Sequence, residues 1–467
     1  MKKLLLILLY LCSMNAFTQN ILGDWHGVAN IQGTDLRIIF HIVEEGDKLL
    51  STLDSPDQGA TGIPTTATTF EAQQLMITAE ALGLKYKGTL AKNGQEIEGT
   101  LYQGSLELPM VLSKEKIEKK VVKRLQDPVD FPYLQEEVKF VNSNGGHSLA
   151  GTLTIPEDKE FEQVVILISG SGPQDRNEEV KQFNHRPFLV LSDYLTRQGI
   201  AVLRYDDRGC YASEGDYKSA TSKDFAEDVT AAIAYLKERP DMQAKKIGLV
   251  GHSEGGMIAP MVAADKNAVD FVVSLAGIGM KGADLLVLQS KKIGLAEGAS
   301  PELIDINCGI LEKMYGYLRD SKDSDKATLK TGLLDILEKN YQALPGTAAM
   351  SEEEKATFFE EQMSTILTDW FLYLIRFDPA DYLSKVNCPF LAANGALDMQ
   401  VPVEENFEGM EKALAHNSQA TFKSFENLNH LFQTAKTGAP SEYGEIEETF
   451  NEEAMKYLVD WMKNLNP

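Results

Sequence analysis

A serine flanked by glycines is the feature of this chain whose residue types and spacing could do chemistry. Residues 251–255 read Gly-His-Ser-Glu-Gly, with a strand-like run at 246–250 before them and small residues after them. A strand that turns sharply into a helix at Gly-x-Ser-x-Gly holds the serine hydroxyl exposed on a strained turn, where the glycines leave room for the backbone. The pattern therefore predicts a nucleophile elbow at Ser253.

The elbow serine needs a partner base. A serine hydroxyl is a poor nucleophile until a neighbouring base takes its proton and an acid orients that base, and at elbows of this kind the chain order is serine, acid, histidine. Of the seven histidines, only His416 and His430 lie well beyond the serine. His416 ends the helical stretch 403–415 and is expected in solvent, and His252 is expected to point away from its serine neighbour. We therefore predict His430, which follows a strand-like run, as the base.

The acid is expected after a buried strand that lies between the serine and the histidine. Residues 389–398 supply such a strand, a glycine turn and then Asp398. An aspartate after a glycine turn is ordinarily a turn residue. Its place between Ser253 and His430 favours a catalytic acid, which would hold the imidazole in one tautomer and stabilise the imidazolium.

An oxyanion hole requires two backbone N–H groups that face the oxygen on which negative charge develops. One donor is expected from the residue after the nucleophile, Glu254. The other is expected from the loop after the strand-like run 164–168, which reads Ser-Gly-Ser-Gly. The first Ser-Gly of this loop stands where many hydrolases have His-Gly, so Ser171 is the predicted donor and Gly172 the close alternative. A plain flexible turn is the other interpretation of this loop.

From about residue 138 to the C-terminus, the chain resembles bacterial α/β-hydrolases of the carboxylesterase kind, a group that overlaps with serine aminopeptidases. The matching motifs lie at residues 169–176, 204–209, 251–256, 394–398 and 428–430. The resemblance implies an α/β-hydrolase fold and a serine hydrolase. In one departure, Tyr211 stands where related hydrolases have a glycine, which puts the shape of that loop in doubt. We interpret its neighbours Asp206, Asp207 and Arg208 as an ion-pair cluster that fixes the loop.

The first residues predict the compartment of the protein. Two lysines, an apolar run at 4–11 and a plausible cleavage site at 16–18 are typical of a signal peptide, which is too short to cross a bilayer as a stable helix. We expect an exported protein, periplasmic or secreted, with no stable membrane insertion. Cys12 would leave with the signal peptide, and the three cysteines that remain imply no disulfide framework.

The segment after the predicted signal peptide has a different character. Short runs that alternate apolar and polar residues, such as 36–42 and 106–112, are separated by turn signals. This pattern predicts a small all-β barrel or sandwich, and the Gly-x-Trp at 23–25 is similar to the opening of lipocalin-like barrels. The predicted divisions are a signal peptide at 1–18, an all-β accessory domain at 19–117, a linker at 118–136 and a hydrolase domain at 137–467.

A long insert interrupts the hydrolase region. More than a hundred residues separate the strand-like run 271–276 from the strand before the predicted acid, far more than one crossover helix needs. Helical patterns such as 302–318 and 366–377 predict a helical cap at about 280–383. Trp370 in this cap either lines an acyl pocket or packs in the cap core. The predicted fold is therefore an α/β-hydrolase fold with a helical cap insertion, preceded by a small all-β domain.

Composition and motifs indicate which classes of ligand the protein is expected to bind. A formal net charge of −24 argues against nucleic acid, since no basic patch is visible. No metal and no other cofactor is expected, because the chain has no His-Glu-x-x-His or paired-cysteine pattern and the serine chemistry is complete without one. A cap shapes specificity and favours substrates of modest size.

Three functions follow from these observations, in order of preference. The first is hydrolysis of a small-molecule carboxylic ester through an acyl-enzyme. The second is a serine aminopeptidase acting on short peptides, which needs carboxylates for an α-ammonium group. Acidic cap residues are candidates, although such a run is also typical of a solvated helix start: Glu352, Glu353, Glu354, Glu360 and Glu361. The third is a binding module with vestigial hydrolase activity. The substrate-binding residues, the acyl and leaving groups and the oligomeric state stay open.

Overall fold

The structure is a computed structural model of the chain and divides into two compact units. One unit holds the described residues up to 118 together with 341–343 and 352–358, and the other holds 122–340 and 359–465. The residues that the structure describes are 21–31, 34–46, 48–58, 60–103, 106–118, 122–157, 160–343 and 352–465. The predicted signal peptide lies outside the described residues.

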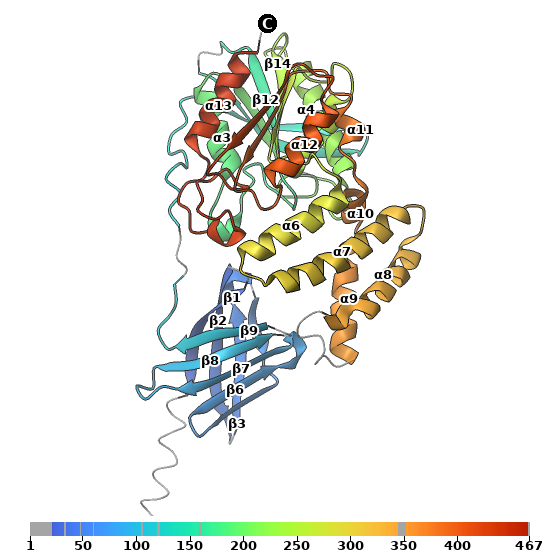
Figure 1. Cartoon of the computed structure of the whole chain (residues 1–467). Helices are drawn as coiled ribbons and strands as arrows, with labels where there is room; N and C mark the ends of the chain where they lie inside the picture. Colours follow the sequence, from blue (N-terminus) through green and yellow to red (C-terminus); the bar gives the residue numbers. More distant parts are fainter. Residues whose placement is uncertain are drawn as a thin grey trace, which may run out of the picture. The chain divides into compact units, whose positions relative to one another are not determined.

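The first unit is a closed antiparallel β-barrel, drawn in blue in Figure 1. Its strands are β1 (Gly23–Ile31), β2 (Thr34–Glu45), β3 (Lys48–Ser55), β4 (Ala60–Pro64), β5 (Ala67–Glu71), β6 (Gln74–Ala79), β7 (Leu84–Leu90), β8 (Glu96–Gln103) and β9 (Leu106–Ser113). Hydrogen-bonded neighbours follow the order β2-β1-β9-β8-β7-β6-β5-β3, and the pairing of β2 with β3 closes the ring. β4 pairs with β3 outside this ring. The prediction of an all-β domain is confirmed, and the domain is a barrel.

Large side chains fill the interior of the barrel. Trp25, Phe40 and Tyr86 are fully buried, and alternate residues of β7 point inward between lysines that face solvent. The Trp25 indole donates to the carbonyl of Ile21 at 2.7 Å, and the Tyr86 hydroxyl donates to the carbonyl of Ile97 at 2.9 Å. A buried aromatic N–H or O–H group needs such a partner. The barrel is therefore stabilised by a packed aromatic core.

The second unit is built on an eight-stranded sheet in the order β10-β11-β13-β12-β14-β15-β16-β17. Its strands are β10 (Leu134–Asn142), β11 (His147–Ile155), β12 (Gln163–Ile168), β13 (Ala201–Tyr205), β14 (Lys246–His252), β15 (Phe271–Leu275), β16 (Phe390–Gly395) and β17 (Ala420–Phe425). β11 pairs antiparallel with both β10 and β13, and the remaining pairings, from β13 across to β17, are parallel. The carboxyl ends of the parallel strands thus lie at one edge of the sheet, as the α/β-hydrolase fold requires.

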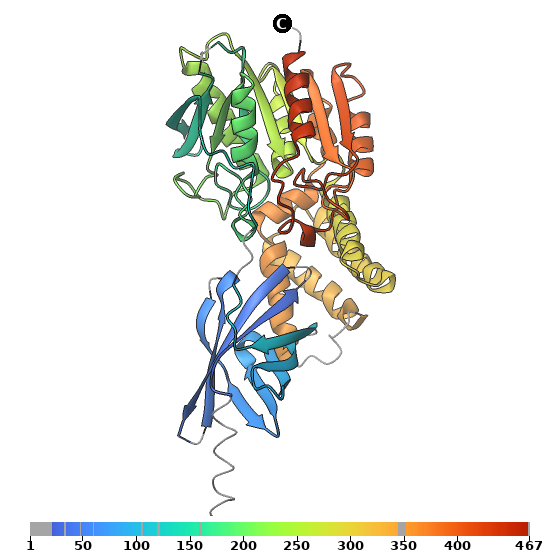
Figure 2. The same cartoon turned by 90° about the vertical axis from the view of Figure 1, so that its left-hand side faces the viewer.

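Helices cover both faces of this sheet, as Figure 2 shows. They are α3 (Pro187–Arg197), α4 (Ser222–Glu238), α5 (Glu254–Ala263), α12 (Val403–Ala413) and α13 (Glu452–Lys463). Val164 and Ile166 of β12 pack in one core with α4, α5 and α12. Val165 and Leu167 point to the other face and pack with α3 and α13. A strand buried on both faces reads as a continuous apolar run, which is why β12 was visible in the sequence.

The predicted cap region is helical in its described residues. Its helices are α6 (Gly282–Ala296), α7 (Pro301–Asp320), α8 (Lys326–Asn340), α9 (Glu352–Ile366), α10 (Asp369–Arg376) and α11 (Ala380–Leu383). The helical pattern at 366–377 corresponds to the last residue of α9 and to α10, with a break in the helix at residues 367–368. The Thr368 hydroxyl accepts from the amide of Phe371 at 3.3 Å and so caps the start of α10.

Part of the predicted linker packs onto the second unit. The Arg124 guanidinium is buried and donates to backbone carbonyls that include Phe183 and Glu448. The Gln126 side chain donates to the carbonyl of Phe450 at 2.6 Å and accepts from the amide of Thr449 at 2.6 Å. These contacts fix residues 124–126 to the hydrolase fold, so this stretch is not a free solvated connection.

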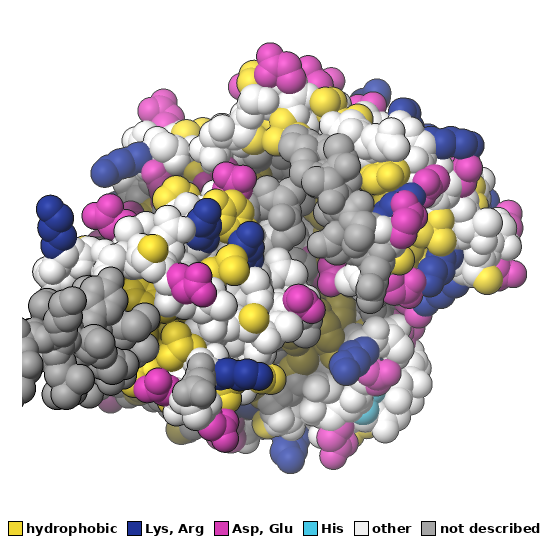
Figure 3. Space-filling view, turned by 90° about the horizontal axis from the view of Figure 1, so that it is seen from below, with side chains coloured by type: hydrophobic (Ala, Val, Ile, Leu, Met, Phe, Trp, Pro, Cys, Tyr) yellow, Lys and Arg dark blue, Asp and Glu magenta, His cyan; other side chains and the backbone are white. Residues whose placement is uncertain are grey.

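The surface carries charges of both signs. Figure 3 shows acidic side chains on the face drawn, with lysines and arginines distributed among them and no continuous basic area over the described residues of that face. Across the part of the chain that the structure describes, none of the helices is long and apolar enough to cross a membrane.

Candidate active site

The elbow predicted at Ser253 is present and strained. β14 ends at His252, α5 begins at Glu254, and Ser253 between them has φ 54° and ψ −114°. A positive φ is costly for a residue with a side chain, and the contacts around Ser253 must impose it. The Ser253 amide donates to the carbonyl of Leu275 at 2.8 Å. A Cβ on Gly255 would lie 2.0 Å from the carbonyl oxygen of Ile168, so only glycine fits there.

The structure brings the predicted serine, histidine and aspartate together. His430 Nε2 lies 3.1 Å from Ser253 Oγ, and His430 Nδ1 lies 2.8 Å from Asp398 Oδ2. An ionised carboxylate only accepts hydrogen bonds, so Nδ1 carries the proton and Nε2 presents its lone pair to the hydroxyl. His430 and Asp398 are buried. This arrangement can remove the hydroxyl proton and stabilise the imidazolium that results.

The second oxygen of Asp398 is held by its own loop. Asp398 Oδ1 accepts from the amides of Gln400 and Val401, each at 2.8 Å. The loop starts at Gly395, where a Cβ would lie 2.1 Å from the carbonyl oxygen of Leu428. The loops that carry the aspartate and the histidine are therefore packed backbone against backbone. Oδ2 stays directed at His430.

The predicted oxyanion loop lies against Ser253. A Cβ on Gly170 would lie 3.3 Å from the Cβ of Ser253 and 3.1 Å from Glu178 Oε1. The Gly170 amide donates to that same oxygen at 2.6 Å. The Ser171 amide follows directly in the chain, and the Glu254 amide is the first of α5. The Glu254 amide thus adjoins Ser253 in the chain, and the Ser171 amide follows a residue that packs against Ser253.

The side chain of Glu254 connects the elbow to the cap. Its Oε1 accepts from Ser222 Oγ at 2.5 Å and from the indole nitrogen of Trp370 at 2.8 Å. Burial raises the pKa of this carboxyl. Trp370 also packs against the main core of the unit, so the structure supports the packing interpretation of this residue. The contact fixes α10 to the segment that carries Ser253.

A second carboxyl, that of the half-buried Asp207, also bonds the predicted oxyanion loop. Asp207 accepts from Ser169 Oγ at 2.8 Å and from the amide of Gln174 at 3.0 Å. Burial raises its pKa to about 8. A small cavity separates this carboxyl from that of Glu254, and its lining is Ile168, Ser169, Gly170, Tyr205, Asp207, Phe225, Asp228, Glu254 and Ile258. The loop predicted as part of an oxyanion hole is therefore bound by Asp207 at Ser169 and by Glu178 at Gly170.

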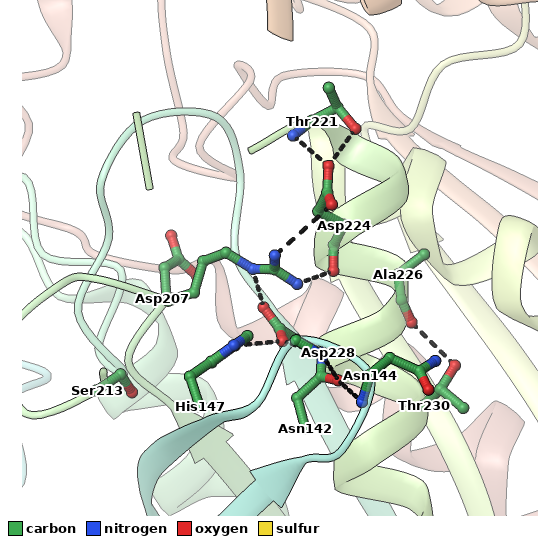
Figure 4. A network of polar contacts seen from close by, with 12 residues as sticks. Asn142, Asn144, His147, Asp207, Ser213, Thr221, Asp224, Ala226, Asp228 and Thr230 are labelled. Carbon is green, nitrogen blue, oxygen red and sulfur yellow. Dashed lines mark hydrogen bonds and ion pairs between the residues drawn. The ribbon is translucent and has the colours of Figure 1, made fainter. Parts of the chain in front are cut away.

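The predicted ion-pair cluster at 206–208 is only partly correct. Asp206 pairs with Arg176 at 2.8 Å, and Arg208 pairs with the buried Asp228 at 2.6 Å. Asp207 instead accepts hydrogen bonds from two neutral groups, the Ser169 hydroxyl and the Gln174 amide. Figure 4 shows Asp228 at the centre of a network of polar contacts. His147 belongs to this network, with its Nε2 3.0 Å from Asp228 Oδ1.

Tyr211, the departure from the related pattern, keeps the backbone that glycine would have. Its φ is 48°, in the left-handed region. The ring is 55 % exposed, and Lys181 Nζ lies 4.9 Å from its centroid. A left-handed φ is costly for a residue with a side chain, so the backbone is strained at Tyr211.

His252 points away from Ser253, as expected, and makes contacts that sequence reasoning missed. Its Nδ1 lies 2.9 Å from Glu178 Oε1, and its Nε2 lies 2.9 Å from the carbonyl oxygen of His430. Glu178 sits in an irregular loop far from the serine in sequence. The only available signal was the run of polar residues 175–178 directly after the oxyanion motif.

The described residues contain no group of three or more His, Cys, Asp or Glu side chains placed to hold a metal ion. The described cysteines, Cys210, Cys308 and Cys388, have free thiols. The exposed His416 bonds the carbonyl of Val386 at 3.0 Å and takes no part in the site.

The sequence profile of the X-Pro dipeptidyl-peptidase (S15) family matches residues 145–423. The chain belongs to this family. The matched region runs from β11 to β17 and includes Ser253 and Asp398, while His430 follows shortly after it.

One relative of this S15 family member is esterase EstD of Thermotoga maritima, which is 26 % identical over 340 residues. The aligned region covers 71 % of this chain and 69 % of EstD. Similar solved structures include the Pyrococcus furiosus esterase Pf2001, with 17 % identity, 72 % of this chain and 94 % of that one covered, and a TM-score of 0.42. The α/β-hydrolase GrgF from Penicillium sp. sh18 is 16 % identical, with a TM-score of 0.42. The match covers 71 % of this chain and 98 % of GrgF. The chain is an enzyme of the hydrolase class with the α/β-hydrolase fold.

Proposed function

We propose that the chain is a serine hydrolase that cleaves carboxylic esters of modest size, with Ser253 as nucleophile, His430 as base and Asp398 as the orienting acid. The observation that carries this proposal is the unbroken series of contacts from Ser253 Oγ through His430 to Asp398, at 3.1 Å and 2.8 Å. The esterase name of the Thermotoga maritima relative favours an ester substrate.

The proposed reaction uses each of these groups twice. Ser253 Oγ attacks the ester carbonyl while its proton passes to His430 Nε2, and the Ser171 and Glu254 amides stabilise the oxyanion. His430 returns the proton to the departing alcohol, which leaves Ser253 acylated. Water then attacks the acyl carbon, gives its proton to His430, and the acid is released as Oγ is protonated again.

A peptidase is the second candidate, because the family to which the chain belongs is described as X-Pro dipeptidyl-peptidases. The same groups would cleave an amide, but a site for the α-ammonium group is also needed. The acidic cap residues lend this little support. Glu360 and Glu361 are exposed, and Glu360 pairs with Lys330 at 2.7 Å, as expected for a solvated helix face.

The test compares the wild type with Ser253→Ala on p-nitrophenyl acyl esters, aminoacyl p-nitroanilides and glycyl-prolyl p-nitroanilide. We expect ester turnover that the substitution abolishes, with the acyl length of the best ester giving the pocket size. Faster cleavage of an anilide would assign the peptidase function. Turnover that Ser253→Ala leaves intact would refute the serine mechanism.

We also propose that the protein is exported after removal of residues 1–18, and that the barrel is an accessory domain. The filled interior of the barrel, with Trp25, Phe40 and Tyr86 fully buried, disfavours a ligand inside it. Expression of the full chain in a bacterial host should give a periplasmic or secreted product. Amino-terminal sequencing should then read from Gln19, whereas an intact Met1 on a cytoplasmic product would contradict export.

A further inference from the structure

The ring of His252 lies between two acceptors that belong to different parts of the site. Nδ1 faces Glu178 Oε1 at 2.9 Å, and Nε2 faces the carbonyl oxygen of His430 at 2.9 Å. A carbonyl oxygen only accepts, so Nε2 must carry a proton. His252 thus holds the main chain of His430, the proposed base. His252 itself takes no part in proton transfer with Ser253.

The second ring nitrogen faces a carboxyl oxygen that already accepts one hydrogen bond. Glu178 Oε1 accepts from the amide of Gly170 at 2.6 Å, and an oxygen that accepts two N–H groups fits an ionised carboxylate. Nδ1 must then donate to it, which makes His252 an imidazolium. Burial alone would lower the pKa of His252, but the charge and the hydrogen bond of Glu178 raise it.

The surroundings of this pair are otherwise closed. His252 and Glu178 are both buried, and Glu178 Oε2 has no hydrogen-bond partner among the described residues. The other titratable groups that act on His252 or face it are Asp398, His430 and His185. The rings of His252 and His430 lie 4.9 Å apart between centroids. A charge without its counter-ion would be costly here, so the carboxylate and the imidazolium stabilise each other.

The pair connects the two loops that the reaction needs. Through the Gly170 amide it holds the segment that leads into Ser171, and through the His430 carbonyl it holds the segment that carries the base. Both contacts are to main-chain atoms, so they fix the course of the loops and not a single rotamer. Gly170 itself packs against Ser253, since a Cβ there would lie 3.3 Å from the serine Cβ.

We propose that Glu178 and His252 form a buried carboxylate–imidazolium bridge that positions the oxyanion loop and the base loop relative to Ser253. This inference rests on the proposed serine-hydrolase function. Glu178 and His252 are positioning residues, because they act through Gly170 and His430 and touch no reacting atom. Their loss should lower kcat and leave KM nearly unchanged, since misplacement of reacting groups by about 1 Å costs about 100-fold in rate.

The experiment uses the full chain with His252→Gln and with Glu178→Gln. Glutamine at 178 keeps the shape and an acceptor for the Gly170 amide but removes the charge. The matched control is His147→Gln, which removes another buried histidine–carboxylate contact, at 3.0 Å to Asp228 (Figure 4), without touching the loops of Gly170 or His430. Thermal unfolding of each variant reports any general loss of stability.

We expect His252→Gln and Glu178→Gln to lower kcat for the best ester by at least about tenfold, with KM within about threefold of wild type, and His147→Gln to keep kcat. Full kcat in both bridge variants, with Ser253→Ala inactive, would overturn the bridge and leave the proposed function standing. An equal loss of kcat in His147→Gln would overturn it too, because the effect would then be one of general stability. If His252→Gln does not fold, the isosteric Glu178→Gln decides.

A second readout does not depend on activity. Nitrogen NMR of histidine-labelled wild type should show both ring nitrogens of His252 protonated at neutral pH, with the assignment made from the signals that His252→Gln removes. A ring nitrogen without its proton would overturn the bridge. If no ester or peptide is turned over by the wild type, the proposed function fails, and this measurement still tests the bridge.

Discussion

Gly255→Ala should disable the enzyme because the elbow and the oxyanion loop meet at this residue. A Cβ on Gly255 would lie 2.0 Å from the carbonyl oxygen of Ile168 and 2.7 Å from that of Ser169, whereas ordinary contacts begin at 3.4 Å. Both obstacles are backbone atoms, so no rotamer change relieves them. α5 and the end of β12 must therefore separate by more than 1 Å, and a displacement of that size predicts a loss in kcat of about 100-fold or more.

The assay is ester hydrolysis by Gly255→Ala, with thermal unfolding measured on the same sample. Gly309→Ala is the matched control, because a Cβ at Gly309 in the middle of α7 meets nothing within 4 Å. We expect the control to keep its activity and to gain about 0.5–1 kcal/mol of stability from better helix propensity. A Gly255→Ala enzyme with kcat within about threefold of wild type would refute the reasoning, since the loop and the elbow would then be free to move apart.

Three further predictions concern the acids and the strained loop. Asp398→Asn should lower kcat by about 10⁴-fold with little change in melting temperature, because an amide facing Nδ1 favours the wrong tautomer of His430. Burial raises the pKa of Asp207 from 3.8 to about 8. Between pH 3.8 and about pH 8 the folded state therefore keeps a proton that the unfolded chain releases, and the wild type loses stability as the pH rises through this range. Asp207→Asn should flatten that fall in urea unfolding compared at pH 5 and pH 8; parallel curves would contradict the assignment. Tyr211→Gly should raise the free energy of unfolding by up to about 1 kcal/mol, since a left-handed φ costs a non-glycine residue about 1–2 kcal/mol and the contact with Lys181 returns only part of this. A lower denaturation midpoint would show that the contact dominates.

The approach of Ser253, His430 and Asp398 could be predicted because each follows a strand-like run in the sequence. Fixed chain order and short spacing from those strands left few candidates. The Glu178 contact could not be predicted in the same way. Glu178 lies in a loop with no periodic pattern, 74 residues from the histidine that it meets. The break between α9 and α10 was missed for a related reason, since Thr368 caps a helix through one local hydrogen bond that apolar periodicity does not reveal.

Acidic side chains recur around Ser253 because the loops there have few regular elements to hold them. Asp398 fixes its own loop through two amides, Glu178 holds Gly170, Asp207 holds Ser169 and Gln174, and Glu254 holds Trp370 of the cap. A carboxylate accepts several hydrogen bonds at once, so one side chain can fix segments that are distant in sequence. The cost is desolvation, and it differs among the four. Asp398 and Glu178 each face a histidine, whereas Asp207 and Glu254 have hydroxyl, amide or indole donors, and burial raises the pKa of both. Ionisation is therefore costly for Asp207 and Glu254, and rising pH should destabilise the folded chain through these two acids.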